Sequence, residues 1–454
     1  MKTPDAGTAR GTSTDALVHA RAVVEELFGN AAVRPFDIAY WDGSIDHGRG
    51  SADFALVINR PGALRRMLLP PSEVSIVEAF LSGNIEVTGN LESAATLGDA
   101  INARLKSVHT LARLVRHLVA LPSRDASDTV RSARAEHSVG RTGRRHDEDR
   151  DRSAIQYHYD VGNDFYALWL DERLVYSCAY WTSPSDLLED AQVAKLDLVC
   201  RKLRLRSGER LLDVGCGWGA LVIHAARTYG VTAVGITLSE AQAKLARERI
   251  AAAGLSDACT IEIRDYRDLR GATFDKIASI GMVEHVGVEN LPRYFSALHS
   301  ALEPGGLLLN HGIVNVTASR PLRPLERVER RLWRRDEFID QYVFPDGKLG
   351  PLHAVIAAAE VAGLETRDVE SLREHYVLTL REWLRRLEHH AAEAITIAGE
   401  RVFRTWRLYM AASANGFATG RLNVVQTLLA KPDERGRVSL PLGSRPETPR
   451  PHAL

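Results

Sequence analysis

A glycine-rich turn after an apolar run is the strongest chemical signal in this sequence. The segment LLDVGCGWG ends an expected buried strand at Asp213 and passes through Gly215, Gly217 and Gly219 into an expected helix. Glycine permits a tight turn and a close approach of the backbone to a ligand, and open α/β sheets bind ligands at the carboxyl ends of their strands. The D-x-G-x-G-x-G spacing differs from the G-x-G-x-x-G spacing of dinucleotide-binding turns. We therefore predict a cofactor site here, with a turn that serves only packing as the alternative.

Polar groups at the ends of the next two expected strands fit a nucleoside. Thr237, Ser239 and Gln242 follow the second strand, where an acidic residue commonly holds a ribose, and they offer neutral hydrogen-bonding groups instead. The third strand ends at Asp265 and Tyr266. The carboxylate could accept a hydrogen bond from an adenine amino group and the ring could stack on the base, whereas a lone tyrosine is by default a surface aromatic. We predict that these five residues complete the cofactor site.

Several segments, in order, resemble those of the cyclopropane-fatty-acid synthases, which include the mycolic acid cyclopropane synthases and related fatty-acid methyltransferases. They cover about residues 156 to 432 and are YHYDVGNDFYALWLD, YSCAYW, LDVGCGWG, TLSEAQ, DYRDL, GMVEHVG, NHGI, QYVFPDGKL and HYVLTLREW. The glycine-rich turn itself resembles motif I of class I methyltransferases. The resemblance implies an α/β fold with a Rossmann-like domain that binds S-adenosylmethionine (AdoMet). It also implies a smaller N-terminal domain, as in the phospholipid-acting bacterial members.

The resemblance implies a role for each matching residue at the cofactor. Tyr159, Tyr176 and Ser177 would flank the methionine portion of AdoMet, and Gly215 and Gly217 would lie against it. The residues that would serve the ribose are Thr237 and Gln242.

The resemblance also implies a bicarbonate ion in the active site. It would be held by the matching residues Cys178, Glu284, His311, Ile313 through its backbone, and Tyr376. Considered one at a time, Cys178 is a small buried side chain, Glu284 a helix cap and His311 a structural strand residue. Their occurrence together in the family's order favours a catalytic site.

The implied reaction adds a methylene group from AdoMet to a cis double bond of a phospholipid acyl chain. Such a double bond is a weak nucleophile, so it must be aligned with the methyl donor in a water-poor, aromatic-lined cavity. A base must then remove a proton from the new methyl group so that a cyclopropane closes. Loss of a different proton would give a methylene branch instead. Because a fold does not dictate a function, the sequence also leaves open a small-molecule methyltransferase and a catalytically silent lipid-binding protein.

Composition divides the chain into a mixed α+β N-terminal part and a part with alternating strands and helices, typical of a doubly wound parallel sheet. The expected strands are RLLDVGC, TAVGITL, CTIEIRD, FDKIASIG and GLLLNHGIV, with helices near 219–229, 239–254 and 290–302. The expected divisions are a flexible N-terminus at 1–14, a lipid- or membrane-associated domain at 15–122, a charged linker at 123–153, a catalytic domain at 154–432 and a disordered tail at 433–454.

Two segments are candidates for contact with a bilayer. LKSVHTLARLVRHLVALP predicts a helix with Val108, Leu111, Val115, Leu118 and Val119 on one face, which fits an interfacial membrane helix or a helix packed on its own core. The segment around residues 316–336 carries seven arginines, Arg320 to Arg335, among interspersed acids. It fits either an anionic bilayer or a solvated helix face.

The composition limits the classes of partner. The 58 basic and 58 acidic residues cancel, so no net charge attracts the chain to nucleic acid. No signal-peptide pattern or stretch of about 18 apolar residues occurs, so we expect a cytoplasmic protein at the inner face of the membrane. Four separated cysteines without a C-x-x-C pair favour free thiols and no metal site. A homodimer is expected from the resemblance alone.

Overall fold

The computed structural model describes residues 7–104, 108–123, 161–269, 271–316, 342–343, 349–438 and 440–441. Contacts divide the chain into two units. The N-terminal unit comprises Met1–Ser138, Leu322–Val343 and Glu400–Asn415, and the catalytic unit comprises Val139–Pro321, Phe344–Gly399 and Gly416–Leu454. Apart from Ser123 and Val316, the expected linker and the arginine-rich segment lie outside the described residues, as does Tyr159.

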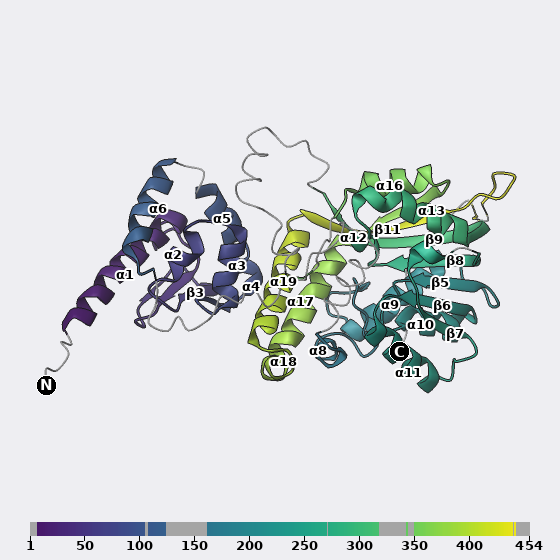
Figure 1. Ribbon diagram of the computed structural model, residues 1–454, viewed down its shortest axis with the longest axis horizontal. Coiled ribbons are helices and arrows are strands. Elements are labelled where there is room, and N and C mark those ends of the chain that lie inside the picture. The colour runs from purple at the N-terminus through teal and green to yellow at the C-terminus, as the bar shows by residue number, and fades with distance from the viewer. Residues whose placement is uncertain are drawn as a thin grey trace. The chain divides into compact units, whose positions relative to one another are not determined.

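The N-terminal unit is a small α+β fold (Figure 1). Its four-stranded sheet has the order β2-β1-β3-β4, in which β1 and β3 are parallel and the other neighbours are antiparallel. Alternate side chains of β1 and β3 are buried, as expected for strands with one face on a core. The elements up to residue 120 are α1 (Gly7–Phe28), β1 (Asp37–Tyr40), β2 (Ile45–Asp46), β3 (Phe54–Ile58), α2 (Ala63–Leu68), α3 (Glu73–Leu81), β4 (Ile85–Gly89), α4 (Leu91–Ala94), α5 (Leu97–Arg104) and α6 (Val108–Ala120).

Helix α19 (Glu400–Ala418) joins the N-terminal unit although it lies far away in the sequence. Arg404 and Arg407 both pair with Glu86 of β4, and Arg401 pairs with Glu78 of α3 at 2.7 Å. These pairs bridge more than 300 residues of sequence, which explains why residues 400–415 group here and not with the rest of the expected 154–432 domain.

Replacing Glu86 with glutamine is expected to loosen α19 within this unit. The amide keeps the side chain's size but removes the charge that Arg404 and Arg407 share. Amide hydrogen exchange of residues 401–409 should become faster by about threefold or more. Glu26→Gln, which alters a pair with Arg113 of α6, is the matched control and should leave this exchange unchanged. Equal exchange in wild type and Glu86→Gln would contradict the assignment.

The catalytic unit contains a seven-stranded sheet of order β10-β11-β9-β8-β5-β6-β7. The strands from β9 to β7 are parallel, and β11 runs antiparallel to both β9 and β10. The strands are β5 (Arg210–Val214), β6 (Thr232–Thr237), β7 (Cys259–Ile263), β8 (Phe274–Ile280), β9 (Leu302–Asn315), β10 (Glu365–Ser371) and β11 (Leu422–Ala430). All five strands predicted from the sequence are confirmed, and they form the parallel part of the sheet.

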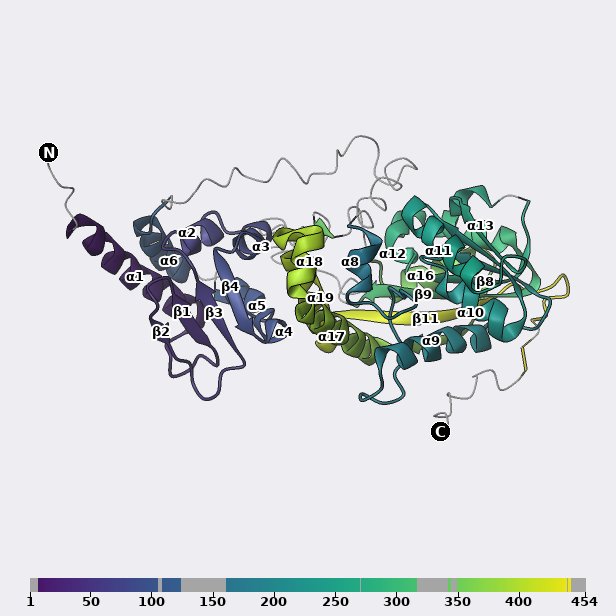
Figure 2. The same ribbon diagram turned by 90° about the horizontal axis from the view of Figure 1, so that it is seen from below.

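Helices cover both faces of this sheet (Figures 1 and 2). Leu211 and Ala233 pack with α9, α10 and α11 on one face, whereas Leu212 and Ile236 pack with α13 and α16 on the other. The helical elements are α8 (Asn163–Ala167), α9 (Leu188–Lys202), α10 (Ala220–Tyr229), α11 (Glu240–Ala252), η2 (Tyr266–Asp268), α12 (Val283–Val286), η3 (Val288–Asn290), α13 (Leu291–Ala301), α16 (Leu352–Val361), α17 (Arg373–His389) and α18 (Ala391–Ala398). The three helices predicted between the strands are α10, α11 and α13.

The two chain ends differ from the sequence-based expectation. Helix α1 begins at Gly7, within the stretch at 1–14 that was expected to be flexible. At the other end, Asp433 accepts a hydrogen bond from the backbone N–H of Arg437 at 2.8 Å, and Val438 and Leu440 pack against the core. The first part of the expected disordered tail is therefore ordered by a local turn and by apolar contacts. Within the described residues, no helix has the length and apolarity needed to cross a membrane.

Candidate functional site

The predicted glycine-rich turn lies at the carboxyl end of β5 and leads into α10. Gly215, Gly217 and Gly219 all have positive φ angles, of 79°, 54° and 80°. Side chains with a Cβ are strained in this left-handed region, so the turn requires glycine at these positions. Gly219 is the N-cap residue of α10. The local sequence therefore bends the chain sharply at the edge where a parallel sheet binds ligands.

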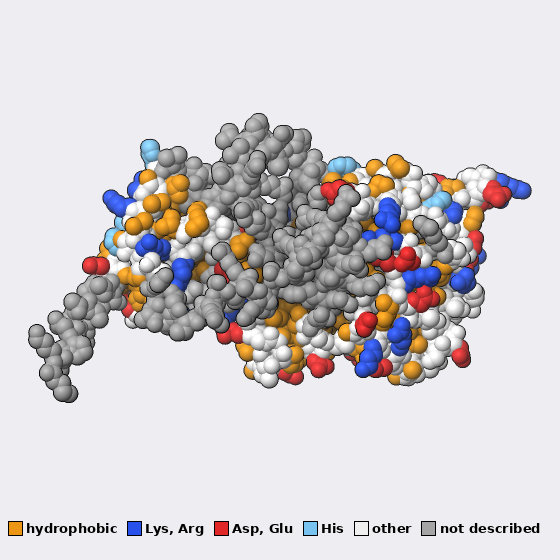
Figure 3. Space-filling view, viewed as in Figure 1, with side chains coloured by type: hydrophobic (Ala, Val, Ile, Leu, Met, Phe, Trp, Pro, Cys, Tyr) orange, Lys and Arg blue, Asp and Glu red, His pale blue; other side chains and the backbone are white. Residues whose placement is uncertain are grey.

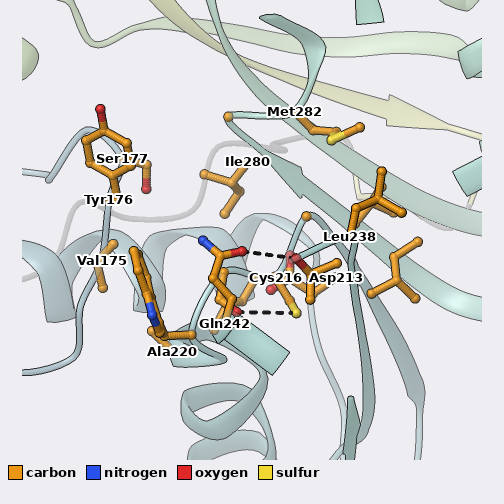
Figure 4. A pocket seen from close by; sticks show the side chains of 18 of the residues that line it. Val175, Tyr176, Ser177, Asp213, Cys216, Ala220, Leu238, Gln242, Ile280 and Met282 are labelled. Atoms are coloured by element: carbon orange, nitrogen blue, oxygen red, sulfur yellow. Dashed lines mark hydrogen bonds between the residues drawn. The ribbon is translucent and has the colours of Figure 1, made fainter. Parts of the chain in front are cut away.

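A cavity opens at this edge, beyond the carboxyl ends of β5, β6, β7 and β8 (Figure 4). Its empty space, including the part that is open to solvent, is about 980 Å³. The predicted cofactor residues that line it are Tyr176, Ser177, Asp213, Gly215, Gly217, Thr237, Gln242, Asp265 and Tyr266. Gly219 and Ser239 are not among the residues that line the cavity, and Tyr159 lies outside the described residues.

Ser239 does not line the cavity, but it forms hydrogen bonds with two residues that do, Thr237 and Gln242. Its hydroxyl caps α11 by accepting from the backbone N–H of Gln242 at 3.3 Å, and its own N–H donates to Thr237 Oγ1 at 3.2 Å. Thr237 Oγ1 in turn donates to Gln242 Oε1 at 3.0 Å (Figure 4). The carbonyl of Gln242 is therefore engaged, which leaves its NH₂ group as the donor available to a ligand.

Asp265 is more fully engaged than the sequence indicated. Arg267 donates from Nε to Oδ1 at 2.8 Å and from Nη2 to Oδ2 at 2.7 Å, and its backbone N–H also donates to Oδ1. The Arg267 guanidinium also lies over the Tyr266 ring, 5.4 Å from its centroid. Tyr266 packs edge-on against Tyr294. This bidentate pair fixes Asp265 and Tyr266 at the cavity, and an adenine would have to use the remaining lone pairs of the carboxylate.

Two oppositely charged side chains face the cavity with little exposure. Asp213 is 3% exposed, and its burial raises the pKa of its carboxyl to about 7 although the Lys195 ammonium opposes the shift. Lys195, which the sequence analysis did not single out, is 1% exposed and donates from Nζ to Ser177 Oγ at 2.9 Å. The available signal was its position on the apolar stripe of a helix, four residues after Ala191 and four before Val199.

The predicted catalytic residue Glu284 contacts the strand that carries two others. Its Oε1 accepts a hydrogen bond from the backbone N–H of Ile313 on β9 at 2.7 Å, whereas its buried Oε2 has no hydrogen-bond partner among the described residues. Burial raises the pKa of Glu284 to about 7. A smaller cavity beside Glu284 is lined by Val283, Val288, Leu291, Ile313, Leu349, Gly350 and Val355.

His311 lies two residues before Ile313 on β9 and is 2% exposed. Its Nδ1 is 3.2 Å from Nε2 of Gln426, the residue opposite it on β11, whereas its buried Nε2 has no partner among the described residues. Burial lowers the pKa of His311 to about 3, so the imidazole is neutral at physiological pH. A neutral ring with one open nitrogen can donate or accept a hydrogen bond there, depending on its tautomer.

Cys178 and Tyr376 meet at the carbonyl oxygen of Leu372, just before α17. Cys178 Sγ is 3.7 Å from this oxygen, and the backbone N–H of Tyr376 donates to it at 3.1 Å. Burial raises the pKa of the Cys178 thiol, which keeps it protonated. Among the described residues, the predicted catalytic five lie outside the lining of the larger cavity.

An aromatic cluster leads from the cofactor cavity toward Tyr376. The ring of Tyr176, which lines the cavity, lies 5.4 Å from the fully buried Trp383, and Trp383 lies 6.0 Å from Tyr376. Trp169 packs against both Tyr176 and Trp383. Behind Tyr176 the rings are buried and exclude water, and the negative faces of such rings can stabilise a positive charge.

Comparisons with known proteins agree on one family. The model described as mycolic acid cyclopropane synthetase matches residues 146–427, and one described as a domain of unknown function matches residues 23–101. A probable fatty acid methyltransferase of Pseudomonas putida is 40% identical over 408 residues, which are 90% of this chain and 94% of that protein. The cyclopropane-fatty-acyl-phospholipid synthase of Escherichia coli (strain K12) is 36% identical over 279 residues, 62% of this chain and 68% of that one.

A solved structure is similar to this chain in fold and in sequence. The crystal structure of mycolic acid cyclopropane synthase CmaA1, complexed with SAH and CTAB, is 34% identical with a TM-score of 0.57. The match covers 62% of this chain and 98% of that one. The residues that line both cavities all lie within residues 146–427, the range that the family model matches.

Proposed function

Because this chain belongs to the mycolic acid cyclopropane synthetase family and is an AdoMet-dependent methyltransferase, we propose that its acceptor is the cis double bond of a phospholipid acyl chain. The proposed product is a cyclopropane acyl chain. Relatives named for fatty-acid methylation and for cyclopropanation of acyl phospholipids support an acyl acceptor. The α+β unit before the catalytic unit supports a phospholipid, since the resemblance associates such an extension with phospholipid-acting members.

The aromatic cluster is the observation that carries this proposal. AdoMet, when bound, supplies an electrophilic methyl group, and its transfer to an alkene leaves a cation on the acyl chain. Water would quench that cation, so the residues between cofactor and base must be apolar and aromatic. Tyr176 lines the cofactor cavity, and the rings of Trp383 and Tyr376 pack in succession behind it, which supports this requirement.

The orphaned polar atoms near β9 fit a small anion such as bicarbonate. Glu284 Oε2 and His311 Nε2 are buried without hydrogen-bond partners among the described residues, and buried polar atoms are rarely left so. Together with Cys178, Tyr376 and the backbone of Ile313, they would hold bicarbonate, which would supply a small base. The neutral imidazole can donate from Nε2, and a protonated Glu284 can donate from Oε2.

The name of the Pseudomonas putida relative favours one second candidate function. A fatty acid methyltransferase would carry out the same methyl transfer and lose a different proton, which yields a methylene-branched chain. Both products follow from one cation, so the position of the base decides between them. A catalytically silent lipid-binding protein is disfavoured because every predicted catalytic side chain is present.

Lipid analysis separates these candidates. We expect phospholipids from cells that lack their own synthase and express this chain to gain about 14 mass units at an unsaturated acyl chain. A gain that resists mild hydrogenation identifies the cyclopropane, and a reducible gain identifies the methylene branch. Unchanged lipids in cells that contain folded, AdoMet-binding protein would contradict the acyl acceptor.

Helix α6 offers a surface for the bilayer in which such a substrate resides. Leu114 and Leu118 pack on the core of the N-terminal unit, but Leu111, Val115 and Val119 on the neighbouring stripe are 38%, 37% and 54% exposed. The helix therefore packs on its own core through Leu114 and Leu118, and its exposed apolar stripe supports the proposal of an interfacial helix. The exposed basic side chains of the helix are His109, Arg113 and Arg116. Figure 3 shows hydrophobic and basic side chains side by side on the N-terminal unit, and this combination favours an anionic bilayer.

Exchanging Val115 and Val119 together for serine is expected to weaken binding of the full chain to phosphatidylglycerol vesicles about fivefold or more, because both lose apolar area that would enter the acyl region. Co-sedimentation measures this binding. Val361→Ser removes an 81% exposed valine from α16 and is the matched control, with binding expected to be unchanged. Equal binding by the double variant and the wild type would remove α6 as the contact surface.

A further inference from the structure

The ammonium group of Lys195 is buried, and it has more N–H donors than the described residues offer hydrogen-bond acceptors. Its ammonium has one hydrogen-bond partner among the described residues, Ser177 Oγ at 2.9 Å, and no carboxylate of those residues lies within 4 Å of it. An ammonium has three N–H donors, and a charge held out of water is costly unless it is paired. Because Lys195 and Ser177 both line the cofactor cavity, the missing partner belongs on the ligand side.

Lys202 on the same helix shows what a structural lysine looks like here. It lies seven residues after Lys195 and is similarly buried, at 3% exposure. Its ammonium pairs with Glu370 and lies 3.7 Å from Asp368, both on β10. The fold therefore places carboxylates in direct contact with one buried lysine of α9, whereas Asp171 and Asp213 act on the charge of the other only from beyond 4 Å. Burial lowers the pKa of Lys195 to about 8, although the charges of Asp171 and Asp213 oppose this shift.

The charges around Lys195 match the amino-acid end of AdoMet. The methionine portion carries one α-carboxylate and one α-ammonium group, and the cavity presents the Lys195 ammonium and the Asp213 carboxylate. We propose that Lys195, held in place by Ser177, binds the α-carboxylate of AdoMet. This assignment rests on AdoMet as the methyl donor and not on the acyl acceptor, so it stands or fails independently of the proposed substrate.

Decarboxylated AdoMet, which retains the sulfonium and the amine but lacks the carboxylate, tests this role. Equilibrium binding to the full-length wild type should be about tenfold or more tighter for AdoMet than for the decarboxylated analogue, as for a charged hydrogen bond. Lys195→Met should lose that factor for AdoMet while its affinity for the analogue changes less than about threefold. The ratio of the two affinities is the readout, which a general loss of folded protein would not change.

Two further variants keep the test decisive. Lys202→Met removes the other buried lysine and should preserve the ratio of affinities, whatever it does to stability. Ser177→Ala releases the Lys195 ammonium and should lower the ratio in part. If Lys195→Met weakens both ligands equally, or if the wild type binds both ligands equally well, Lys195 does not bind the carboxylate. If Lys195→Met does not fold, equal binding of both ligands by the wild type still overturns the proposal, and a ratio unchanged in Ser177→Ala contradicts it as well.

Discussion

Glu284→Gln is expected to reduce acyl-chain modification by about 100-fold or more while AdoMet affinity stays within about twofold of the wild-type value. Glutamine keeps the length of the side chain and can still accept from the Ile313 N–H through its carbonyl oxygen. It cannot ionise, so it loses the acid–base chemistry of a group whose burial raises its pKa to about 7. The amide NH₂ can still donate at the orphaned Oε2 position, as a protonated Glu284 would, so the expected loss isolates the ionisation of Glu284.

Separate measurements of turnover and binding check this result. Product is quantified by mass spectrometry of vesicle lipids, and AdoMet binding by calorimetry. Glu289→Gln, on the exposed η3 turn that follows α12, is the matched control and should retain activity. Full activity of Glu284→Gln would remove Glu284 from the catalytic residues, whereas loss of AdoMet binding would reassign it to the cofactor site.

Trp383→Ala is expected to lower the free energy of unfolding of the catalytic unit by about 3–5 kcal/mol and to abolish turnover. The fully buried ring contacts Trp169, Tyr176 and Tyr376, so its loss leaves a cavity between the cofactor site and the predicted base. Trp383→Phe is the informative partner. The indole Nε1 has no hydrogen-bond partner among the described residues, so phenylalanine loses volume but no hydrogen bond.

Urea unfolding followed by tryptophan fluorescence or circular dichroism measures the effect on stability. Trp383→Phe should cost less than about half of the loss in Trp383→Ala and should retain measurable turnover. If the urea concentration at the midpoint of unfolding is the same for Trp383→Ala as for the wild type, the Trp383 ring does not stabilise the core. If it is destabilised but turns over normally, the aromatic cluster does not line the reaction path.

The local patterns of the sequence were enough to predict the cofactor edge of the sheet. The turn at Gly215, Gly217 and Gly219 follows an apolar strand, and both its conformation and its position are set by nearby residues. The same reasoning assigned Ser239 to the cofactor, but the structure makes it the cap of α11. A serine followed three residues later by a glutamine fits either role, and only the direction of the hydroxyl distinguishes them.

Features that depend on distant parts of the chain could not be predicted in this way. Lys195 lies on the apolar stripe of α9. That no carboxylate of the described residues lies within 4 Å of its ammonium group follows from the tertiary packing. Arg404 and Glu86 are paired across most of the sequence, so no local pattern assigns α19 to the N-terminal unit. The predicted catalytic residues Glu284 and Ile313 were identified from the family resemblance, and the hydrogen bond between them became visible only in the folded chain.

Methyl transfer by the purified protein tests the proposed reaction most directly. The protein is incubated with AdoMet labelled at its methyl carbon and with vesicles of a cis-unsaturated phospholipid, and the acyl chains are then analysed by mass spectrometry. We expect one labelled carbon at each modified double bond, and with it a mass gain that resists mild hydrogenation. Label that stays in AdoMet, or that appears on the head group and not on the acyl chain, while the protein is folded and binds the cofactor, would contradict the proposed reaction.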